Sequence, residues 1–436
     1  MNHGVCRALL LKSSTCLNFL LLFKIHFPTI SQFAALLMLN ISNAVFQLLV
    51  IPILIHYATP IKLGVYFIAL SFGVLASILV NFGSSQTAVV ELRRASNENE
   101  KAIISAETLA VRFYPLWMAV IITLGIATVS DKGIYYFAIL PMLFAEFINP
   151  QFYLTAEYKI SRYSIINIII RALVLGTIYF FRNNDQLIFI SLFSSGLGMF
   201  LLNALFFRQS FFAAHIYTLW PNFKRIIALI KTHTLIVGNG ITVHLQQSLF
   251  LFALPAFASP IFLSAYGLID KLISSCRMMV NAYSAAVMPK ATGEHLQGIE
   301  QWRRLKKQQN SILALACVCL GLVLYFFPHF ILSLLLLGKS NVDAAFMMEA
   351  TRLLKLIAVV PLLIALNVLN VAELILDKKF KSYFGAGLIV LLVAVLFILF
   401  LYLGLPNYTL GYYPMIIEGA CLVIYFLIIQ SNRSNA

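Results

Sequence analysis

Charged residues are scarce in this sequence. Of its 436 residues only 11% are Asp, Glu, Lys or Arg, while 61% are hydrophobic. A typical soluble domain has about 25% charged and about 45–50% apolar residues. A soluble protein of the present composition would expose too much apolar surface to stay dispersed. The composition therefore excludes a soluble globular domain and indicates a membrane protein.

Long stretches contain no charged residue at all. Residues 63–90 form a run of 28 without Asp, Glu, Lys or Arg, and 232–269, 308–338 and 382–417 form runs of 38, 31 and 36. Since a membrane-spanning helix needs about 20 residues, each run has room for one or two spans. The apolar residues do not alternate with polar ones, as the strands of a transmembrane barrel require. The sequence thus predicts an all-α polytopic membrane protein.

Motifs for catalysis, metals and cofactors are lacking. The six cysteines are scattered and none forms a CxxC pair, so buried free thiols are expected rather than a zinc site. Gly338-Lys339-Ser340 resembles the end of a phosphate-binding loop, but Ser333 stands where that motif needs its first glycine. With no HExxH motif and no nucleophile elbow, we expect no metal, no cofactor and no enzymatic activity. Active transport would then draw on an ion gradient or on the gradient of the substrate itself.

About twelve spans fit the hydrophobic pattern, and their flanking bases give an orientation. Cytoplasmic loops of membrane proteins are enriched in Lys and Arg. Here 20 of the 31 Lys and Arg residues lie in the termini and in the loops after even-numbered spans, 5 lie in the loops after odd-numbered spans, and 6 lie within spans. Both termini of this multi-pass protein of the cell inner membrane are therefore predicted to be cytoplasmic. The predicted spans are 30–55, 63–90, 108–130, 134–155, 163–181, 186–207, 230–254, 260–288, 310–337, 354–376, 383–404 and 411–430.

The same orientation explains the net charge of +15. A basic cytoplasmic face is attracted to the anionic lipids of the inner leaflet. No nucleic acid partner is expected.

The spans are predicted to form two six-helix parallel repeats. Ala58–Tyr66 matches Ala258–Tyr266 without a gap, and Glu157–Tyr163 resembles Asp377–Tyr383. Both matches fall at corresponding places in two six-span halves, and because six is even the halves cross the membrane in the same direction. Such repeats are related by an axis along the membrane normal and enclose a central cavity that suits alternating access.

The repeats divide the chain into four parts. We predict a cytoplasmic lead-in over 1–27, an N-terminal six-helix bundle over 28–208, a cytoplasmic linker over 209–229 and a C-terminal six-helix bundle over 230–436. A cleaved signal peptide is the alternative for the first part, although its apolar run is short for one.

Basic residues lie deep within the predicted spans, where each costs about 2.5–3.5 kcal/mol to insert. The deepest are Arg171, Lys271 and Arg277, and we expect them to line the central cavity and to bind the substrate. Buried cations suit an anionic substrate, and the planar fork of arginine binds two phosphate oxygens. Bases nearer the span ends, among them Arg112, are expected to extend toward the membrane surface instead.

Three acids, Glu146, Asp270 and Glu418, are also deep, and we predict a role for them in ion coupling or gating. Asp270 lies beside Lys271 and is expected to stay ionised as a structural or gating partner. Glu146 and Glu418 have no base within their own spans. Provided that no base from another helix reaches them, they are placed to bind and release a proton near physiological pH.

From Phe33 onward the sequence resembles the Wzx-type O-antigen and polysaccharide flippases of the multidrug/oligosaccharidyl-lipid/polysaccharide exporter superfamily. The resemblance depends on the layout of six plus six spans with inward termini and on short motifs at their ends. These motifs are Leu63-Gly64-Val65-Tyr66, Asn81-Phe82-Gly83, Glu91-Leu92-Arg93-Arg94, Tyr266-Gly267-Leu268-Ile269-Asp270-Lys271 and Met288-Pro289-Lys290.

The resemblance implies a flippase that moves an undecaprenyl-diphosphate-linked oligosaccharide from the cytoplasmic to the periplasmic leaflet, with a cationic cavity for the diphosphate and the sugars. The implied partners are this lipid-linked oligosaccharide, membrane lipids and other polysaccharide assembly proteins. One alternative is a multidrug or other lipid-linked glycan exporter of the same superfamily. Another is a membrane polysaccharide polymerase, which would need a larger extracytoplasmic loop than any predicted here.

Overall fold

The computed structural model of the chain describes residues 34–83, 88–89, 91–93, 95–211, 223–336, 343–377 and 379–434. The predicted lead-in over 1–27 and residues 212–222 of the predicted linker lie outside these ranges. Every regular element within them is a helix. Ten helical segments are long and apolar enough to cross a membrane, so the chain is a multi-pass α-helical membrane protein.

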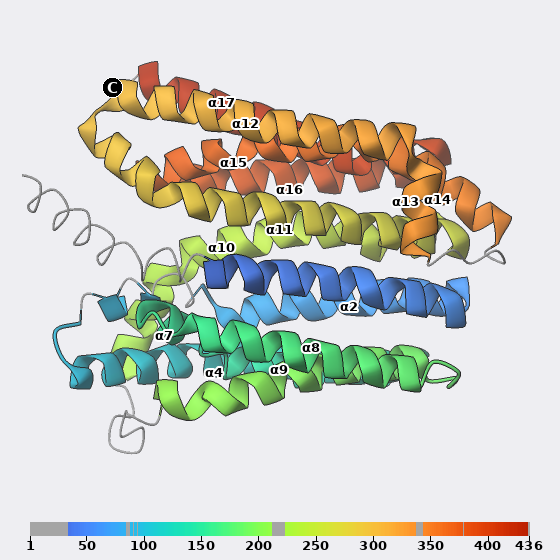
Figure 1. Ribbon diagram of the computed structural model, residues 1–436, viewed down its shortest axis with the longest axis horizontal. Coiled ribbons are helices and arrows are strands. Elements are labelled where there is room, and N and C mark those ends of the chain that lie inside the picture. The colour runs from blue at the N-terminus through green and yellow to red at the C-terminus, as the bar shows by residue number, and fades with distance from the viewer. Residues whose placement is uncertain are drawn as a thin grey trace, which may run out of the picture.

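The helices form two groups, which lie one above the other in Figure 1. The N-terminal half contains the first helix Ala34–Tyr57, α2 (Pro60–Asn81), α4 (Glu98–Val129), α5 (Gly133–Phe137), α6 (Leu140–Phe147), α7 (Gln151–Ala156), α8 (Ile160–Phe180) and α9 (Leu187–Phe211). The C-terminal half contains α10 (Phe223–Ala253), α11 (Pro260–Gln297), α12 (Ile299–Phe326), α13 (Pro328–Leu335), α14 (Ala344–Leu356), α15 (Val360–Leu376), α16 (Phe380–Tyr402) and α17 (Tyr413–Ser434). Short 3₁₀ turns follow α10, join α14 to α15 and precede α17.

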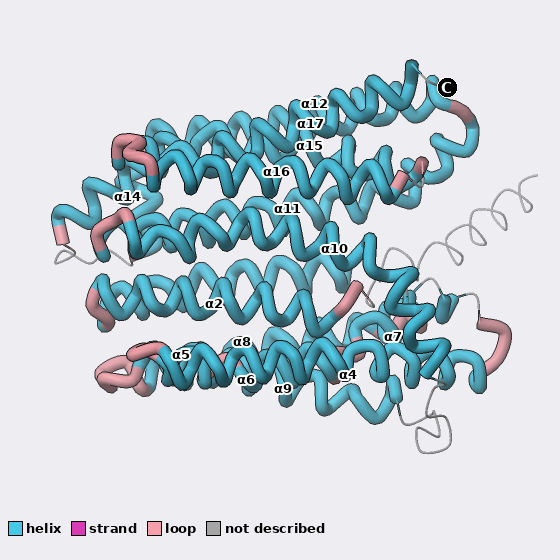
Figure 2. Tube along the Cα trace, turned by 180° about the vertical axis from the view of Figure 1, so that it is seen from behind, coloured by secondary structure: helices cyan, strands magenta, loops and turns pink. Residues whose placement is uncertain are grey.

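Two long helices, α10 and α11, complete the set of twelve predicted spans. They have 31 and 38 residues, which correspond to lengths of roughly 46 and 57 Å at 1.5 Å per residue. Neither is among the ten most apolar segments, because α10 carries Asn239, His244 and Gln246 and α11 carries its buried charges. Both views place them between α2 and the rest of the C-terminal half (Figures 1 and 2). The least apolar spans therefore lie in the interior, and the prediction of an all-α fold of about twelve membrane helices in two six-helix repeats is confirmed.

The sequence repeat has the same local structure in both copies. Thr59 caps α2 by accepting a hydrogen bond from the Lys62 amide at 3.4 Å, and Ser259 caps α11 by accepting one from the Phe262 amide at 3.2 Å. In each case a proline occupies the first helical turn, where its missing N–H costs nothing. A Thr or Ser cap followed by a proline thus begins the second helix of each half.

The second repeated segment also recurs in detail. Glu157 and Lys159 approach to 3.6 Å, as do Asp377 and Lys379. The Lys159 amide donates to the carbonyl of the residue five positions earlier at 2.8 Å, and the Lys379 amide does the same at 2.9 Å. The turn between the fourth and fifth spans is therefore built alike in both halves.

The halves meet closely at the N-terminal ends of α2 and α11. A Cβ atom on Gly64 would lie 2.6 Å from the Leu263 side chain, and one on Gly267 would overlap the ring of Phe67. The Ser264 hydroxyl donates to the backbone carbonyl of Pro60. Small residues let helix backbones approach in this way within membranes. The two halves are thus packed together at the end of the bundle that is predicted to be extracytoplasmic.

Several predicted spans differ from the helices in their bounds. Span 63–90 ends early, because α2 stops at Asn81, and span 260–288 continues to Gln297. Span 108–130 belongs to a helix that begins ten residues earlier, because Asn97 caps it by accepting from the Glu100 amide at 2.8 Å. Span 134–155 is broken into α5, α6 and α7. Span 310–337 begins at Ile299 and ends at Phe326, since Pro328 starts the separate helix α13. Hydropathy alone misses polar turns that extend a helix beyond the membrane.

Candidate functional site

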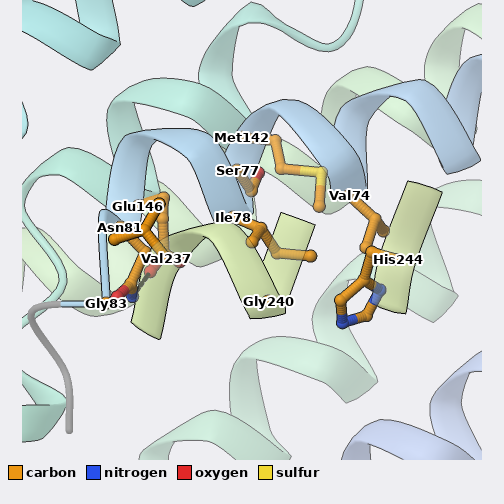
Figure 3. A pocket seen from close by; sticks show the side chains of 10 residues that line it. All are labelled: Val74, Ser77, Ile78, Asn81, Gly83, Met142, Glu146, Val237, Gly240 and His244. Atoms are coloured by element: carbon orange, nitrogen blue, oxygen red, sulfur yellow. Dashed lines mark hydrogen bonds between the residues drawn. The ribbon is translucent and has the colours of Figure 1, made fainter. Parts of the chain in front are cut away.

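A cavity of about 360 Å³ lies between the two halves. Helices α2 and α6 of the N-terminal half form one wall, and α10 of the C-terminal half forms the other (Figure 3). Its volume lies within the range of about 300–1,000 Å³ that is usual for small-molecule sites. Because the residues from α2 belong to its C-terminal half, the cavity lies toward the predicted cytoplasmic end. The described residues that line it are Val74, Ser77, Ile78, Asn81, Gly83, Met142, Glu146, Val237, Gly240 and His244.

Glu146 is the acidic group of this cavity. Asn81 from α2 donates an amide hydrogen bond to its Oε1 atom. The Asn149 amide lies 3.3 Å from Oε1 and 3.2 Å from Oε2. Asn149 is placed there by the break between α6 and α7. Two amides from two elements therefore hold the carboxylate at one end of the cavity, where Figure 3 shows it beside Asn81.

Arg112 lies behind Glu146 and corrects one expectation from the sequence. We expected this arginine to extend toward the membrane surface, but its side chain is completely buried. Its guanidinium donates to the Asn149 carbonyl at 2.8 Å and to the carbonyls of Glu146 and Phe147 at 3.3 Å each. These carbonyls lie at and just beyond the C-terminal end of α6, and a cation is favourable at such an end.

Arg112 also changes the surroundings expected for Glu146. The guanidinium acts electrostatically on the Glu146 carboxylate. The condition that no base from another helix reaches Glu146 is therefore not met, because α4 supplies one. The sequence did not reveal this contact, since 34 residues separate the two positions.

His244 is a residue that the sequence analysis missed. It lies on α10 and lines the cavity at the end opposite Glu146 and Asn81 (Figure 3). Asp270, Lys271 and Arg277 of α11 all act on it electrostatically. One available signal was that His244 is a titratable residue within the uncharged run 232–269. This histidine therefore lines the cavity and is within electrostatic range of charged residues of the C-terminal half.

Those charged residues form two ion pairs. Lys271 Nζ lies 3.3 Å from Asp270 Oδ2, as their adjacency led us to expect. Arg277 donates to Glu418 Oε1 from Nη2 at 2.7 Å and from Nε at 3.1 Å. Glu418, on α17, was expected to have no basic neighbour, but α11 brings one to it. The condition for free proton exchange at Glu418 is therefore not met either.

Arg171 occupies a different place, inside the N-terminal half. Its Nε donates to Asn43 Oδ1 at 3.2 Å, and its guanidinium lies 4.5 Å from the centre of the Phe46 ring. Met199 Sδ lies 3.0 Å from Nη2. None of the interactions found among the described residues joins Arg171 to Lys271 or Arg277. The three deep bases are thus divided between the halves, and their contact with a substrate stays a prediction.

No family model and no curated protein matches the sequence. Among solved structures, the lipid II flippase MurJ in an inward closed conformation superposes with a TM-score of 0.67 at 14% identity, covering 93% of this chain and 86% of that one. An inward-facing multidrug resistance MATE family transporter of the MOP superfamily gives 0.66 at 13% identity, over 93% and 97%. A MOP superfamily transporter from Pyrococcus furiosus gives 0.59 at 12% identity, over 94% and 95%. The chain therefore has the fold of these transporters.

Proposed function

We propose that this protein is a flippase that moves an undecaprenyl-diphosphate-linked oligosaccharide, such as an O-antigen repeat unit, from the cytoplasmic to the periplasmic leaflet by alternating access. One observation carries the proposal: α11 holds Lys271 and Arg277 largely buried, within electrostatic range of His244, which lines the cavity between the halves. Buried bases are costly in a membrane protein and are usually retained for function. The fold shared with a lipid II flippase supports the same conclusion.

The ion pairs suggest how a diphosphate is bound and released. Each of the two bases is neutralised by a carboxylate in the present conformation. A diphosphate would compete with Asp270 for Lys271 and with Glu418 for Arg277, and its oxygens match the fork of the guanidinium. Substrate binding would therefore free carboxylates whose charge favours the return of the pairs once the substrate has left. The lipid tail would remain in the bilayer.

The tight contact between α2 and α11 supports alternating access. The halves are closed at the predicted extracytoplasmic end by Gly64 against Leu263 and by Phe67 against Gly267. The cavity lies on the opposite side of this contact. Rocking of one half against the other around a site near the midplane is the usual motion of proteins built from repeats. Separation of this contact would then be the step that opens the site outward.

Ion coupling is assigned to Glu146 in this proposal, with Arg112 as its cationic neighbour. Glu146 lines the cavity, whereas Glu418 makes a direct ion pair with Arg277. A proton on Glu146 would remove a negative charge from the site that an anionic substrate enters. The expected effect of Glu146→Gln is loss of the response to a pH gradient, with slow equilibration retained.

A multidrug exporter of the same superfamily is the second candidate. The observation that favours it is the carboxylate of Glu146 in the cavity, which would attract an organic cation. The two candidates differ in the sign of the substrate charge and can be separated by one assay.

The test is flipping in proteoliposomes. The labelled substrates are an undecaprenyl-diphosphate-linked sugar and, separately, ethidium. We expect the wild-type protein to flip the lipid, and Lys271→Gln and Arg277→Gln to lower the rate by about 10-fold or more, as for loss of a charge-assisted contact of 1.5–3 kcal/mol. Arg352→Gln, which removes an exposed base on α14, is the control and should flip normally. Transport of ethidium without flipping of the lipid would contradict the proposal.

A further inference from the structure

The described residues that line the cavity between the halves differ in charge from the ion pairs of the C-terminal half. None of these ten residues is a lysine or arginine. Their polar groups are the Ser77 hydroxyl, the Asn81 amide, the Glu146 carboxylate and the His244 imidazole. Between them lie the apolar side chains of Val74, Ile78, Met142 and Val237. A diphosphate would find no cation among the lining residues that the structure describes, so this part of the cavity suits a different part of a ligand.

The arrangement of the polar groups suits hydroxyl groups. Glu146 Oε1 accepts from both Asn81 and Asn149, but Oε2 accepts only from Asn149 among the hydrogen bonds found. A carboxylate has about four acceptor sites in total, so Oε2 keeps room for a further donor. Ser77 is 8% exposed, and its buried Oγ atom has no hydrogen-bond partner in the described part of the chain. A buried hydroxyl without a partner is costly, and it indicates a site completed by a ligand.

The size and shape of the cavity point to one ring. About 360 Å³ is at the small end of ligand sites and does not suit a whole oligosaccharide. Figure 3 shows Asn81 and Glu146 at one end, His244 at the other, and Ile78 and Met142 in between. A pyranose has hydroxyls around its rim and apolar C–H faces, which match this order of polar ends and apolar middle.

We propose that this cavity binds a single uncharged, hydroxyl-rich sugar ring, with Ser77, Asn81, Glu146 and His244 as its hydrogen-bonding groups. In terms of the proposed function, on which this assignment rests, the ring is the sugar next to the diphosphate. His244 is within electrostatic reach of Lys271 and Arg277, so a diphosphate held by those bases would place its first sugar at the His244 end. The charged and uncharged parts of the substrate would thus bind to different helices.

Gly240 provides a direct probe of the site. A Cβ atom there would meet only Ile78, at 3.8 Å, so a cysteine fits without displacing a neighbour. In a protein whose six native cysteines are replaced, Gly240→Cys would place one thiol in the cavity. Ser96→Cys, at an exposed position outside the cavity, is the matched control. A probe that consumes the labelling reagent or alters the membrane would change the labelling of this thiol as well.

The experiment measures the rate at which a water-soluble maleimide labels the thiol of the Gly240→Cys protein in nanodiscs. The probes are a panel of free hexoses and N-acetylhexosamines, inorganic diphosphate and tetraphenylphosphonium. We expect at least one sugar to slow labelling saturably at millimolar concentration, and neither diphosphate nor the organic cation to do so. Labelling of the Ser96→Cys protein should be unchanged by every probe.

Further substitutions test the named groups. Ser77→Ala and His244→Leu, each combined with Gly240→Cys, should weaken sugar protection by about 3- to 10-fold, as for loss of one hydrogen bond. His244→Gln keeps a donor and should retain most of the protection, which a merely structural histidine would not predict. Thermal stability of each variant shows whether it is folded.

Two results would overturn the assignment: protection by tetraphenylphosphonium, or protection by no sugar of the panel. Either leaves the flippase proposal standing if the lipid is still flipped. Sugar protection in a protein that fails to flip the lipid would instead refute the proposed function and leave the sugar site intact.

Discussion

The ion pair between Arg277 and Glu418 offers a quantitative test of how the C-terminal half is held together. Its two side chains are only 17% and 9% exposed, and it joins α11 to α17. Removing one partner of a buried pair usually costs about 3–5 kcal/mol, because the other charge stays buried without compensation. In Glu418→Gln the amide oxygen can still accept one hydrogen bond, and Asp270 still attracts Arg277. We therefore expect a loss near the lower limit, about 3 kcal/mol.

Replacing both partners should be far less harmful. In Arg277→Met/Glu418→Met no charge remains, and apolar side chains of similar length fill the space. Such replacements are often neutral or stabilising by about 1–4 kcal/mol. The pair would then be a functional rather than a stabilising feature, and the double variant should be stable but inactive in flipping.

The assay is the unfolding equilibrium of the protein in bicelles, measured for the wild type, Glu418→Gln, both single methionine variants and the double variant. The coupling energy from this cycle isolates the pairwise interaction. A double variant that is as unstable as the sum of the singles, which means a coupling energy near zero, would refute the ion pair and show that packing accounts for the loss.

Two further predictions concern the arrangement of the halves in the membrane. Gly267→Ala should force the ring of Phe67 away, at a cost of about 1–3 kcal/mol for overpacking. The distance between spin labels at positions 61 and 261 should then increase, and an unchanged distance would contradict the contact. Reporter fusions should be active in the cytoplasm after Arg93, Arg225, Lys307 and Lys379 and in the periplasm at Asp131, Ser259 and Asn407, whereas alkaline phosphatase activity at Lys307 would reverse the predicted orientation.

The sequence was sufficient for the parts of the fold that depend on local signals. Uncharged runs located the spans. The pairs Thr59-Pro60 and Ser259-Pro260 begin α2 and α11 through capping, which depends on residues within one turn, but we had interpreted them only as part of the repeat. The repeat was visible for the same reason, since each copy builds the same local turn. The broken fourth span was missed because α5, α6 and α7 are all apolar enough to look like one helix.

The site was predicted less completely, because partners distant in sequence determine it. All six deep charged residues lie inside the protein, but Arg277 and Glu418 are separated by 141 positions, and no spacing rule links them. Arg112 looked like a residue near a span end, yet the break after α6 draws it inward to the exposed carbonyls. His244 carries no formal charge at neutral pH and was not counted among the buried charges.

The contact between the halves also has a consequence for the origin of the repeat. The matching segments are offset by 200 positions, so Phe67 and Gly267 are equivalent residues, and they pack against each other. A pair of equivalent residues in mutual contact lies on the symmetry axis itself. Two identical halves would bring either two phenylalanines or two glycines together there, and the first would collide while the second would leave a void. A homodimer of either half could not form the contact of Phe67 with Gly267 that the single chain forms. The fused protein is therefore necessarily asymmetric where its halves meet.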